Sequence, residues 1–245
     1  MSIRFAIAPI NWSNDDDHTL GANISLQQCL EEMVKSGYSG CELGHKFPKN
    51  PLKLKKTVDT FGLQVTSDWI GTELSVRGRY EQSIADFKAR VDFLKPLGVK
   101  ALKVCECGHS IQQTNNPIFS TKVEFSDAQW HLVSQGLNRM GEIARKANMF
   151  VSYHQHLGTG VESEEQLHRL MSTTDPELVT LLPDTGHLLA AGMNPLDIFS
   201  RYLSRIKYVH LKDVRGEILA IAKQKNLSFM DAVRAGLFSV PGDGS

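Results

Sequence analysis

The amino-acid sequence predicts an α/β protein, a (β/α)₈ barrel that forms one domain over residues 1–245. Short apolar runs alternate with longer amphipathic segments, which indicates parallel strands joined by helices. Ionisable residues follow many different strands at the same end, a habit of the barrel. The alternative is an open doubly wound sheet, which for dinucleotides needs Gly-x-Gly-x-x-Gly after the first strand. NWSNDDD stands at that place instead, so the barrel is favoured.

Seven strands are expected, each brief, apolar and bounded by turn residues, as in a sheet that is covered on both faces. They are Phe5–Pro9, Gly40–Leu43, Gln64–Trp69, Ala101–Cys105, Phe150–His154, Val179–Pro183 and Lys207–Leu211.

The helices between these strands have clear start and stop signals. Capping-box patterns (a Ser followed three residues later by Gln) open three of them, and a Pro after Asn opens another. Glycines mark the ends of several. The expected helices begin after Ser25, Ser126, Ser163 and Asn194, with others over Pro51–Thr60 and Tyr80–Pro96.

An eighth strand is missing from this pattern. The sequence stops at FSVPGDGS, where an eighth repeat would begin, so we expect a C-terminally shortened barrel. Loss of one strand would expose two sheet edges, which favours pairing between chains. The expectation is poor solubility or self-association, including a possible homo-oligomer.

The overall composition disfavours several classes of function. Lys plus Arg and Asp plus Glu both number 27, so no basic excess points to nucleic acid. No apolar segment approaches 18 residues, and the N-terminus is too short for a secretory signal, so neither a membrane nor export is expected. The four cysteines fit reduced thiols better than disulfides. A cytoplasmic enzyme with a small-molecule substrate is the interpretation.

Ionisable side chains gather at the ends of three successive strands in the second half of the chain. Carboxylate and imidazole ligands suit Mn²⁺, Co²⁺ or Zn²⁺, whereas Mg²⁺ prefers more oxygen. Taken singly, each has a simpler explanation, such as a packed histidine, a helix cap or a surface ion pair. Together they favour a shared ion, because unpaired buried charge costs several kcal/mol. The residues are His154, His156, Glu162, Asp184, His187, His210 and Lys212.

A second group of polar and aromatic residues follows the first four strands. Polar side chains beside Trp rings can form a pocket for a sugar-like molecule. Core packing is the alternative for each Trp. The candidate substrate-binding residues are Asn11, Trp12, Glu42, His45, Trp69 and Glu106.

Five motifs resemble the inosose dehydratases, within the xylose-isomerase-like barrel superfamily: NWSNDD, ELGHKFP, YHQHLGTGVES, DTGHLLAAG and HLKDV. DTGH and HLKD are shared across the superfamily, whereas ELGHKFP and YHQHLGTGVE are more specific. The resemblance implies a xylose-isomerase-like barrel, bound Mn²⁺ or Co²⁺, and a role in inositol catabolism. The implied reaction dehydrates 2-keto-myo-inositol (scyllo-inosose) to a trihydroxycyclohexane-1,2-dione. Glutathione is a further possible cofactor by resemblance.

The resemblance also implies site roles. In the superfamily the metal is held by residues after strands five to eight, and Asp184 and His210 match the second and third of these. His154 stands at the position of the first ligand, where the superfamily has a Glu. Glu162, in the loop that follows, could supply the missing carboxylate. The fourth ligand would lie beyond Ser245. We expect His187 and Lys212 to contact substrate and His156 or Glu162 to transfer protons, which leaves acid and base unassigned.

Three other functions remain open. A sugar isomerase or epimerase would use the same enediolate chemistry but return the proton. A repair nuclease of the superfamily would need several zinc ions and a basic groove, which the zero net charge disfavours. An inactive, shortened paralogue is the third alternative.

Overall fold

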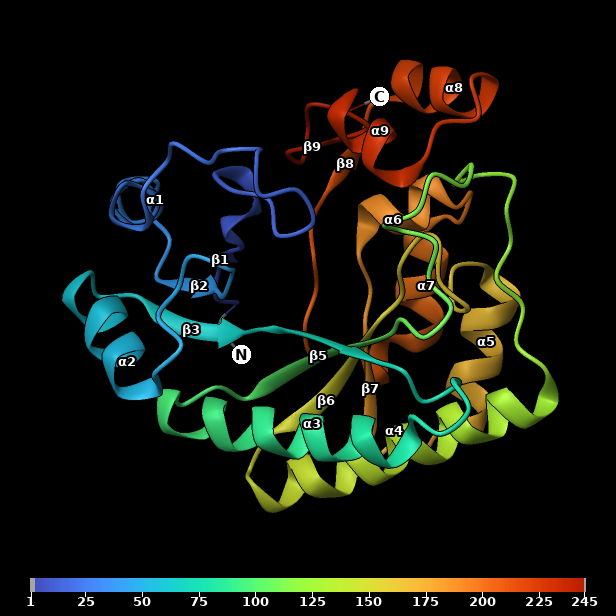
Figure 1. Ribbon diagram of the computed structural model, residues 1–245, viewed down its shortest axis with the longest axis horizontal. Coiled ribbons are helices and arrows are strands. Elements are labelled where there is room, and N and C mark those ends of the chain that lie inside the picture. The colour runs from blue at the N-terminus through green and yellow to red at the C-terminus, as the bar shows by residue number, and fades with distance from the viewer. Residues whose placement is uncertain (1–2, 245) are drawn as a thin grey trace.

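The computed structural model describes residues 3–244. Its parallel strands lie side by side in the order of the sequence, in two sheets (Figure 1). The first sheet holds β1 (Ala6–Ile7), β2 (Gly40–Glu42) and β3 (Gln64–Ser67), and the second holds β4 (Trp69–Thr72), β5 (Ala101–Glu106), β6 (Phe150–His154) and β7 (Val179–Leu182).

One predicted strand runs through both sheets and is interrupted at a single residue. β3 pairs with β2, and β4 pairs with β5, both in parallel. Asp68 lies between them, buried, and forms an ion pair with Arg90. The strand predicted over Gln64–Trp69 therefore continues to Thr72. Because β3 belongs to the first sheet and β4 to the second, this segment connects the two sheets.

Of the seventh predicted strand, Lys207–Leu211, only His210 forms a β-bridge, in parallel with Asp184. A second parallel bridge joins Ile206, just before the predicted strand, to Leu181 of β7. This segment follows the 3₁₀ turn η3 (Leu203–Arg205). Within residues 3–244, β1 has a strand partner on the β2 side only.

The helices cover the outer face of the sheets, with α3 and α4 along the side opposite the C-terminal segment (Figure 1). Ser126 and Ser163 form complete capping boxes and Asn194 caps a helix that begins with Pro, as the sequence predicts. The box predicted at Ser25 is only half formed: Ser25 accepts from the Gln28 backbone N–H, but the Gln28 side chain donates to Glu32 instead. Asn50 caps a further helix that begins with Pro. These helices are α1 (Leu26–Lys35), α2 (Pro51–Thr60), α3 (Tyr80–Leu94), α4 (Asp127–Lys146), α5 (Glu164–Thr173) and α7 (Pro195–Tyr202), with the 3₁₀ turns η1 (Pro9–Asn11) and η2 (Lys95–Leu97).

A C-terminal unit covers one end of the strands, and the sequence did not predict it. The strands β8 (Asp213–Val214) and β9 (Phe238–Ser239) pair antiparallel. Helices α8 (Gly216–Gln224) and α9 (Phe229–Arg234) lie between them in sequence. In Figure 1 this unit sits above the short helix α6 (Thr185–Ala190), which starts directly after β7. The unit therefore forms a roof over the carboxyl ends of β6 and β7.

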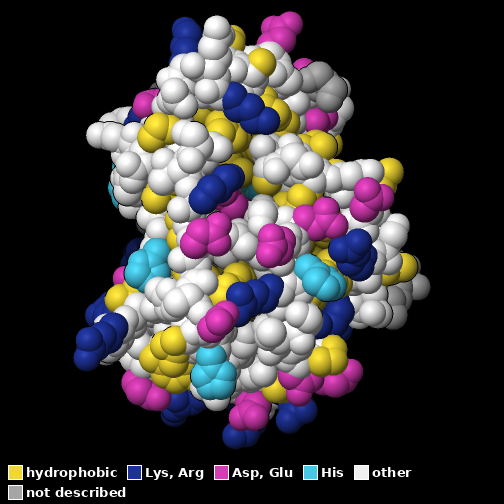
Figure 2. All heavy atoms as spheres, turned by 90° about the vertical axis from the view of Figure 1, so that its right-hand side faces the viewer, with side chains coloured by type: hydrophobic (Ala, Val, Ile, Leu, Met, Phe, Trp, Pro, Cys, Tyr) yellow, Lys and Arg dark blue, Asp and Glu magenta, His cyan; other side chains and the backbone are white. Residues whose placement is uncertain are grey.

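The surface shows charges of both signs. On the face drawn in Figure 2, Lys and Arg alternate with Asp and Glu, without a continuous basic stripe. None of the helices in the described part of the chain has the length and apolar character needed to span a bilayer.

Candidate active site

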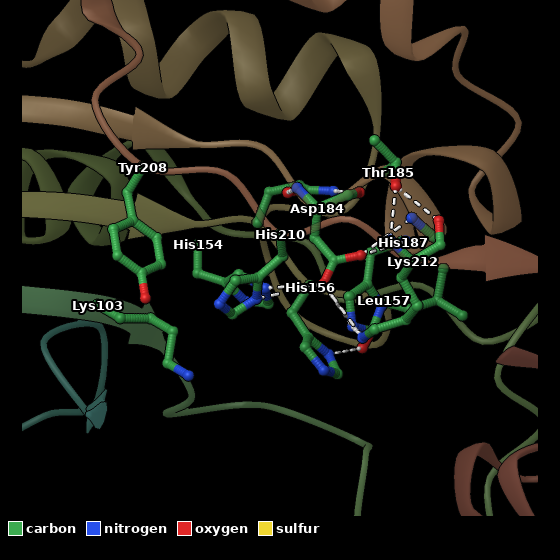
Figure 3. Close-up of polar contacts among 12 residues, drawn as sticks. Lys103, His154, His156, Leu157, Asp184, Thr185, His187, Tyr208, His210 and Lys212 are labelled. Carbon is green, nitrogen blue, oxygen red and sulfur yellow. Dashed lines mark hydrogen bonds and ion pairs between the residues drawn. The ribbon is translucent and has the colours of Figure 1, made fainter. Parts of the chain in front are cut away.

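Asp184 is the centre of the candidate site (Figure 3). It follows β7 and caps α6, because its Oδ1 accepts hydrogen bonds from the backbone N–H groups of Gly186 and His187 at 3.0 and 3.1 Å. The side chain is fully buried. The cap fixes one oxygen, so the other, Oδ2, is presented to the neighbouring strand ends.

Cationic and imidazole groups from separate strands surround Asp184 Oδ2. His154 Nε2 lies 3.3 Å away, His210 Nδ1 3.5 Å and Lys212 Nζ 3.1 Å. His187 Nε2 lies 4.0 Å from the same oxygen. Four side chains that the sequence places after three different strands therefore converge on one carboxylate oxygen.

This donor set fits a divalent metal ion. One ligand atom from each of His154, Asp184 and His187 lies within 4.8 Å of the others. Among the described residues, Nδ1 of His154 and Nδ1 of His187 are buried and have no hydrogen-bond partner. Such orphaned nitrogens are uncommon in protein interiors. Two imidazoles and a carboxylate suit ions of the Mn²⁺, Co²⁺ and Zn²⁺ type.

Burial and charge set the protonation of the cluster. Burial lowers the pKa of His154 to about 4 and holds the pKa of His156 and His187 well below the ordinary value. Burial alone would raise the pKa of Asp184, but Lys212 and the neighbouring histidines hold it well below its usual range. Neutral imidazoles and an ionised carboxylate are the forms that bind metal.

A second buried carboxylate, Glu42, lies at the end of β2. Its Oε2 forms an ion pair with Lys103 of β5. Its Oε1 accepts from Tyr208 at 3.0 Å and lies 2.8 Å from His210 Nε2. Burial opposes the charge on Glu42, yet Lys103 and His210 keep its pKa well below the ordinary value.

Aromatic rings border the cluster on two sides. Trp69 of β4 makes edge contacts with His154 and His156, at centroid distances of 5.5 and 5.7 Å. From the C-terminal unit, the Phe238 ring lies 5.0 Å from His187, and Lys212 Nζ lies 4.7 Å above the same Phe238 ring. The roof therefore covers His187, which is buried, whereas the side chain of His210 stays partly exposed.

His156 joins the cluster through His187, since the two ring centroids are 3.7 Å apart. Its Nδ1 lies 2.6 Å from Gln112 Nε2 and 2.8 Å from the Leu157 carbonyl. Phe229 of the roof packs on it at 5.2 Å. The structure thus brings the predicted residues Glu42, Trp69, His154, His156, Asp184, His187, His210 and Lys212 into one continuous network.

Glu162 does not join this network. Its Oε2 accepts from the Gly158 backbone N–H at 2.7 Å, and its Oε1 pairs with Lys122 Nζ at 2.6 Å. Both oxygens thus hold the loop after β6 in place, because Gly158 belongs to the Gly-Thr-Gly turn. The geometry favours a loop-holding role for Glu162 over the predicted metal ligation or proton transfer.

Glu106 serves a similar purpose after β5. Its carboxylate accepts from the Thr72 and Ser75 hydroxyls, both at 2.7 Å, and from the backbone N–H of Leu74 at 2.9 Å. The side chain is 1% exposed. Its acceptor capacity is directed at the β4–α3 loop and not at a substrate pocket, contrary to the expectation.

The remaining predicted substrate residues lie apart from the cluster. Trp12 donates its indole N–H to Glu32 of α1 and packs on the core. Asn11 is exposed at the end of η1. His45 lies 2.7 Å from Asp15 Oδ1 and stacks on His18. For Trp12, the core-packing alternative is the one that the geometry supports.

Two residues of the network, Lys103 and Tyr208, were not predicted from the sequence. Lys103 is 7% exposed in a strand whose six residues are all buried, and Tyr208 comes two residues before His210. A lysine in the middle of an apolar run was a usable signal, because an unpaired ammonium is costly there. Nothing local marks Tyr208, since its partner Glu42 is 166 residues away in the chain.

The buried histidines predict that the metal-free protein loses stability as the pH falls. In the unfolded state His154 binds a proton near pH 6.5, whereas in the folded state it does so only near pH 4. The free energy of unfolding therefore falls below about pH 6.5, by about 2 kcal/mol at about pH 5 from this residue alone. His156 and His187 act in the same direction, and His210, whose pKa is raised by Glu42 despite its burial, opposes them.

Urea unfolding at about pH 7.5, 6 and 5 measures this effect. The midpoint should fall continuously over that range. Asp184 and Glu42 act at lower pH, because their lowered pKa values contribute stability that is lost only when the carboxylates protonate. A midpoint that stays constant between about pH 7.5 and 5 would contradict the buried, neutral histidines.

Comparison with known proteins shows which family the chain resembles. Residues 30–237 match the model of the xylose isomerase-like TIM barrel family. Inosose dehydratases from Bacillus cereus (strain AH820) and Clostridium botulinum (strain Alaska E43 / Type E3) are 44% and 45% identical over 244 residues, 99% of this chain and 82% of each relative. A solved structure of the IOLI protein with a bound zinc atom superimposes with a TM-score of 0.66, at 16% identity over 87% of this chain and 74% of that one.

These matches confirm the barrel that the sequence predicts and the family that its motifs resemble. The family match spans β2 to the roof, and the similarity to the dehydratases spans all the strands and the Asp184 cluster. The chain therefore belongs to the inosose dehydratase family of xylose isomerase-like TIM barrels.

Proposed function

We propose that this chain is a lyase that removes water from 2-keto-myo-inositol to give a trihydroxycyclohexane-1,2-dione, as part of inositol catabolism. The observation that carries the proposal is the 43–45% identity to inosose dehydratases over 99% of the chain. The buried carboxylate and imidazole cluster supplies groups suited to this chemistry. The substrate would be a small cyclic polyol ketone, and no nucleic-acid or membrane partner is required.

The metal would be held by Asp184, His154 and His210, with His187 close enough to contribute its imidazole. Mn²⁺ or Co²⁺ is proposed, because both accept mixed nitrogen and oxygen ligands. When bound, such an ion supplies a Lewis acid for the ketone oxygen and a neighbouring hydroxyl.

The protein's own residues move the protons. Lys212 carries an ammonium 3.1 Å from Asp184 and 3.3 Å from His187, and it can deliver a proton to the departing hydroxyl. His156 is kept neutral by burial, which holds its pKa low, so it can accept the proton from the carbon beside the ketone. General acid–base catalysis contributes about 10²- to 10⁴-fold for each group. Phe229 of the roof packs on His156, which is buried, and so limits the access of water to the proton acceptor.

The test combines substrate and metal. Purified protein treated with a chelator should lose dehydration of keto-inositol, followed by the absorbance of the dione, and should regain it with Mn²⁺ or Co²⁺. Zn²⁺ and Mg²⁺ are the comparison ions. Ketohexoses are offered in parallel and should give no isomerised product. Isomerisation of a ketohexose without dehydration of keto-inositol would show that the protein is an isomerase instead. Full dehydratase activity in the chelated protein would show that the reaction does not need the metal.

We further propose that the chain is one domain that works in the cytoplasm. All four cysteines have free thiols, and Cys29, Cys41 and Cys105 are buried. Reduced thiols are usual in the cytosol. Self-association through the strand edges stays a prediction, which a measurement of molar mass in solution would test.

A further inference from the structure

Glu42 was expected to bind substrate, but its surroundings leave it no room to do so. The side chain is 2% exposed. Lys103 occupies one carboxylate oxygen, and His210 and Tyr208 share the other. Each contact comes from the protein, so the carboxylate acts on its neighbours and not on a ligand.

The important neighbour is His210, because its ring lies between the two buried carboxylates. Nε2 lies 2.8 Å from Glu42 Oε1, and Nδ1 lies 3.5 Å from Asp184 Oδ2. An ionised carboxylate can only accept hydrogen bonds. Nε2 must therefore carry the proton that Glu42 accepts, and Nδ1 is the nitrogen turned toward the candidate metal centre.

Lys103 explains how a carboxylate can be buried beside this histidine. Its ammonium pairs with Glu42 Oε2 and is itself only 7% exposed. The pair leaves no net charge in the strand layer. Tyr208 donates to Glu42 from two residues before His210, so side chains from β5 and from the segment after η3 both hold the carboxylate. Its position, and with it the orientation of the imidazole, is fixed before any ligand arrives.

We propose that Glu42, neutralised by Lys103, is a positioning residue that holds a proton on Nε2 of His210 and so directs Nδ1 at the metal centre. Partners of this kind commonly set the tautomer and basicity of a ligating histidine. The inference rests on the proposed function only in taking the Asp184 cluster as a metal site.

The experiment compares two double variants that both remove the buried lysine, so that neither leaves an unpaired charge. Glu42→Leu with Lys103→Met removes the acceptor, whereas Glu42→Gln with Lys103→Met keeps a carbonyl oxygen at the same place. Zn²⁺ is the probe, because it is diamagnetic and allows nitrogen-15 NMR of labelled histidines. His210 signals are assigned by their loss in His210→Asn.

The wild type and the Gln variant should show a slowly exchanging proton on Nε2 of His210, with and without Zn²⁺, and ligation through Nδ1 in the zinc form. The Leu variant should lose this proton signal and bind Zn²⁺ about 10- to 100-fold more weakly, as is typical when such a partner is removed. The Gln variant should stay within about threefold of the wild type, well short of that loss.

Two results would overturn the inference: ligation of zinc through Nε2 in the wild type, or a Leu variant whose zinc affinity and proton signal match those of the Gln variant. The wild-type spectrum decides the orientation even where a variant does not fold. Failure of the proposed function is a separate outcome, because a protein that binds Zn²⁺ as described yet does not dehydrate keto-inositol refutes the reaction and leaves the role of Glu42 standing.

Discussion

Asp184→Asn is expected to remove metal binding and dehydratase activity together. Asn is as good a helix cap as Asp, so the bonds to Gly186 and His187 should survive. The charge on Oδ2 would be lost, and an amide would face His154, His210 and Lys212 instead. Loss of a bound Lewis acid is worth several kcal/mol of transition-state stabilisation, so kcat/KM should fall about 10³-fold or more.

Metal content by mass spectrometry and kcat/KM with keto-inositol are measured on the same samples. Asp213→Asn is the matched control, since that carboxylate accepts from the backbone N–H groups of Val214, Gly242 and Gly244 and lies outside the Asp184 cluster. The control should keep its metal and stay within about tenfold of the wild-type rate, far from the effect of losing a Lewis acid. A folded Asp184→Asn protein with normal metal content and full turnover would exclude Asp184 as a ligand.

The sequence predicts those site residues whose positions follow from the ends of the strands. Parallel strands bring their carboxyl ends to one edge, so His154, Asp184 and His210 had to lie near one another. Helix starts were predictable for a similar reason, because a capping box such as Ser126 with Gln129 is complete within four residues.

What could not be predicted depends on partners that are distant in the chain. Glu162 forms an ion pair with Lys122, which lies 40 residues earlier in the chain. Glu106 faces amides of the preceding loop, whose path no spacing reveals. The break at Asp68 depends on Arg90 of the next helix. Glu162 and Glu106 were assigned to a ligand, whereas long-range folding gives both carboxylates protein partners.

The roof shows the same limit for secondary structure. Its strands β8 and β9 have two residues each, and its helix α9 has six, too few for a clear periodic pattern. These elements are held by Phe229 and Phe238 packing on His156 and His187. Their structure therefore depends on the very cluster that they cover.

Lys212→Met is expected to lower kcat about 10²- to 10⁴-fold while metal binding is kept. Met retains the apolar stem, which packs against Gly186, but it lacks the ammonium and cannot carry a proton. The ammonium lies 3.1 Å from Asp184 Oδ2, where it competes with a cation for that oxygen. Its removal should therefore leave metal affinity unchanged or raise it, which is the opposite of the Asp184→Asn result.

The separation of these two effects is what assigns Lys212 to proton transfer. Zinc or manganese affinity is measured beside kcat and KM, and Lys223→Met, which removes an ammonium placed over the Phe119 ring, serves as the control. If Lys212→Met lost metal in proportion to its rate, the ammonium would be acting on the metal centre and not on the substrate. If its rate stayed within about tenfold of the wild type, below the usual worth of a general acid, Lys212 would not be the donor of the proton for the departing hydroxyl.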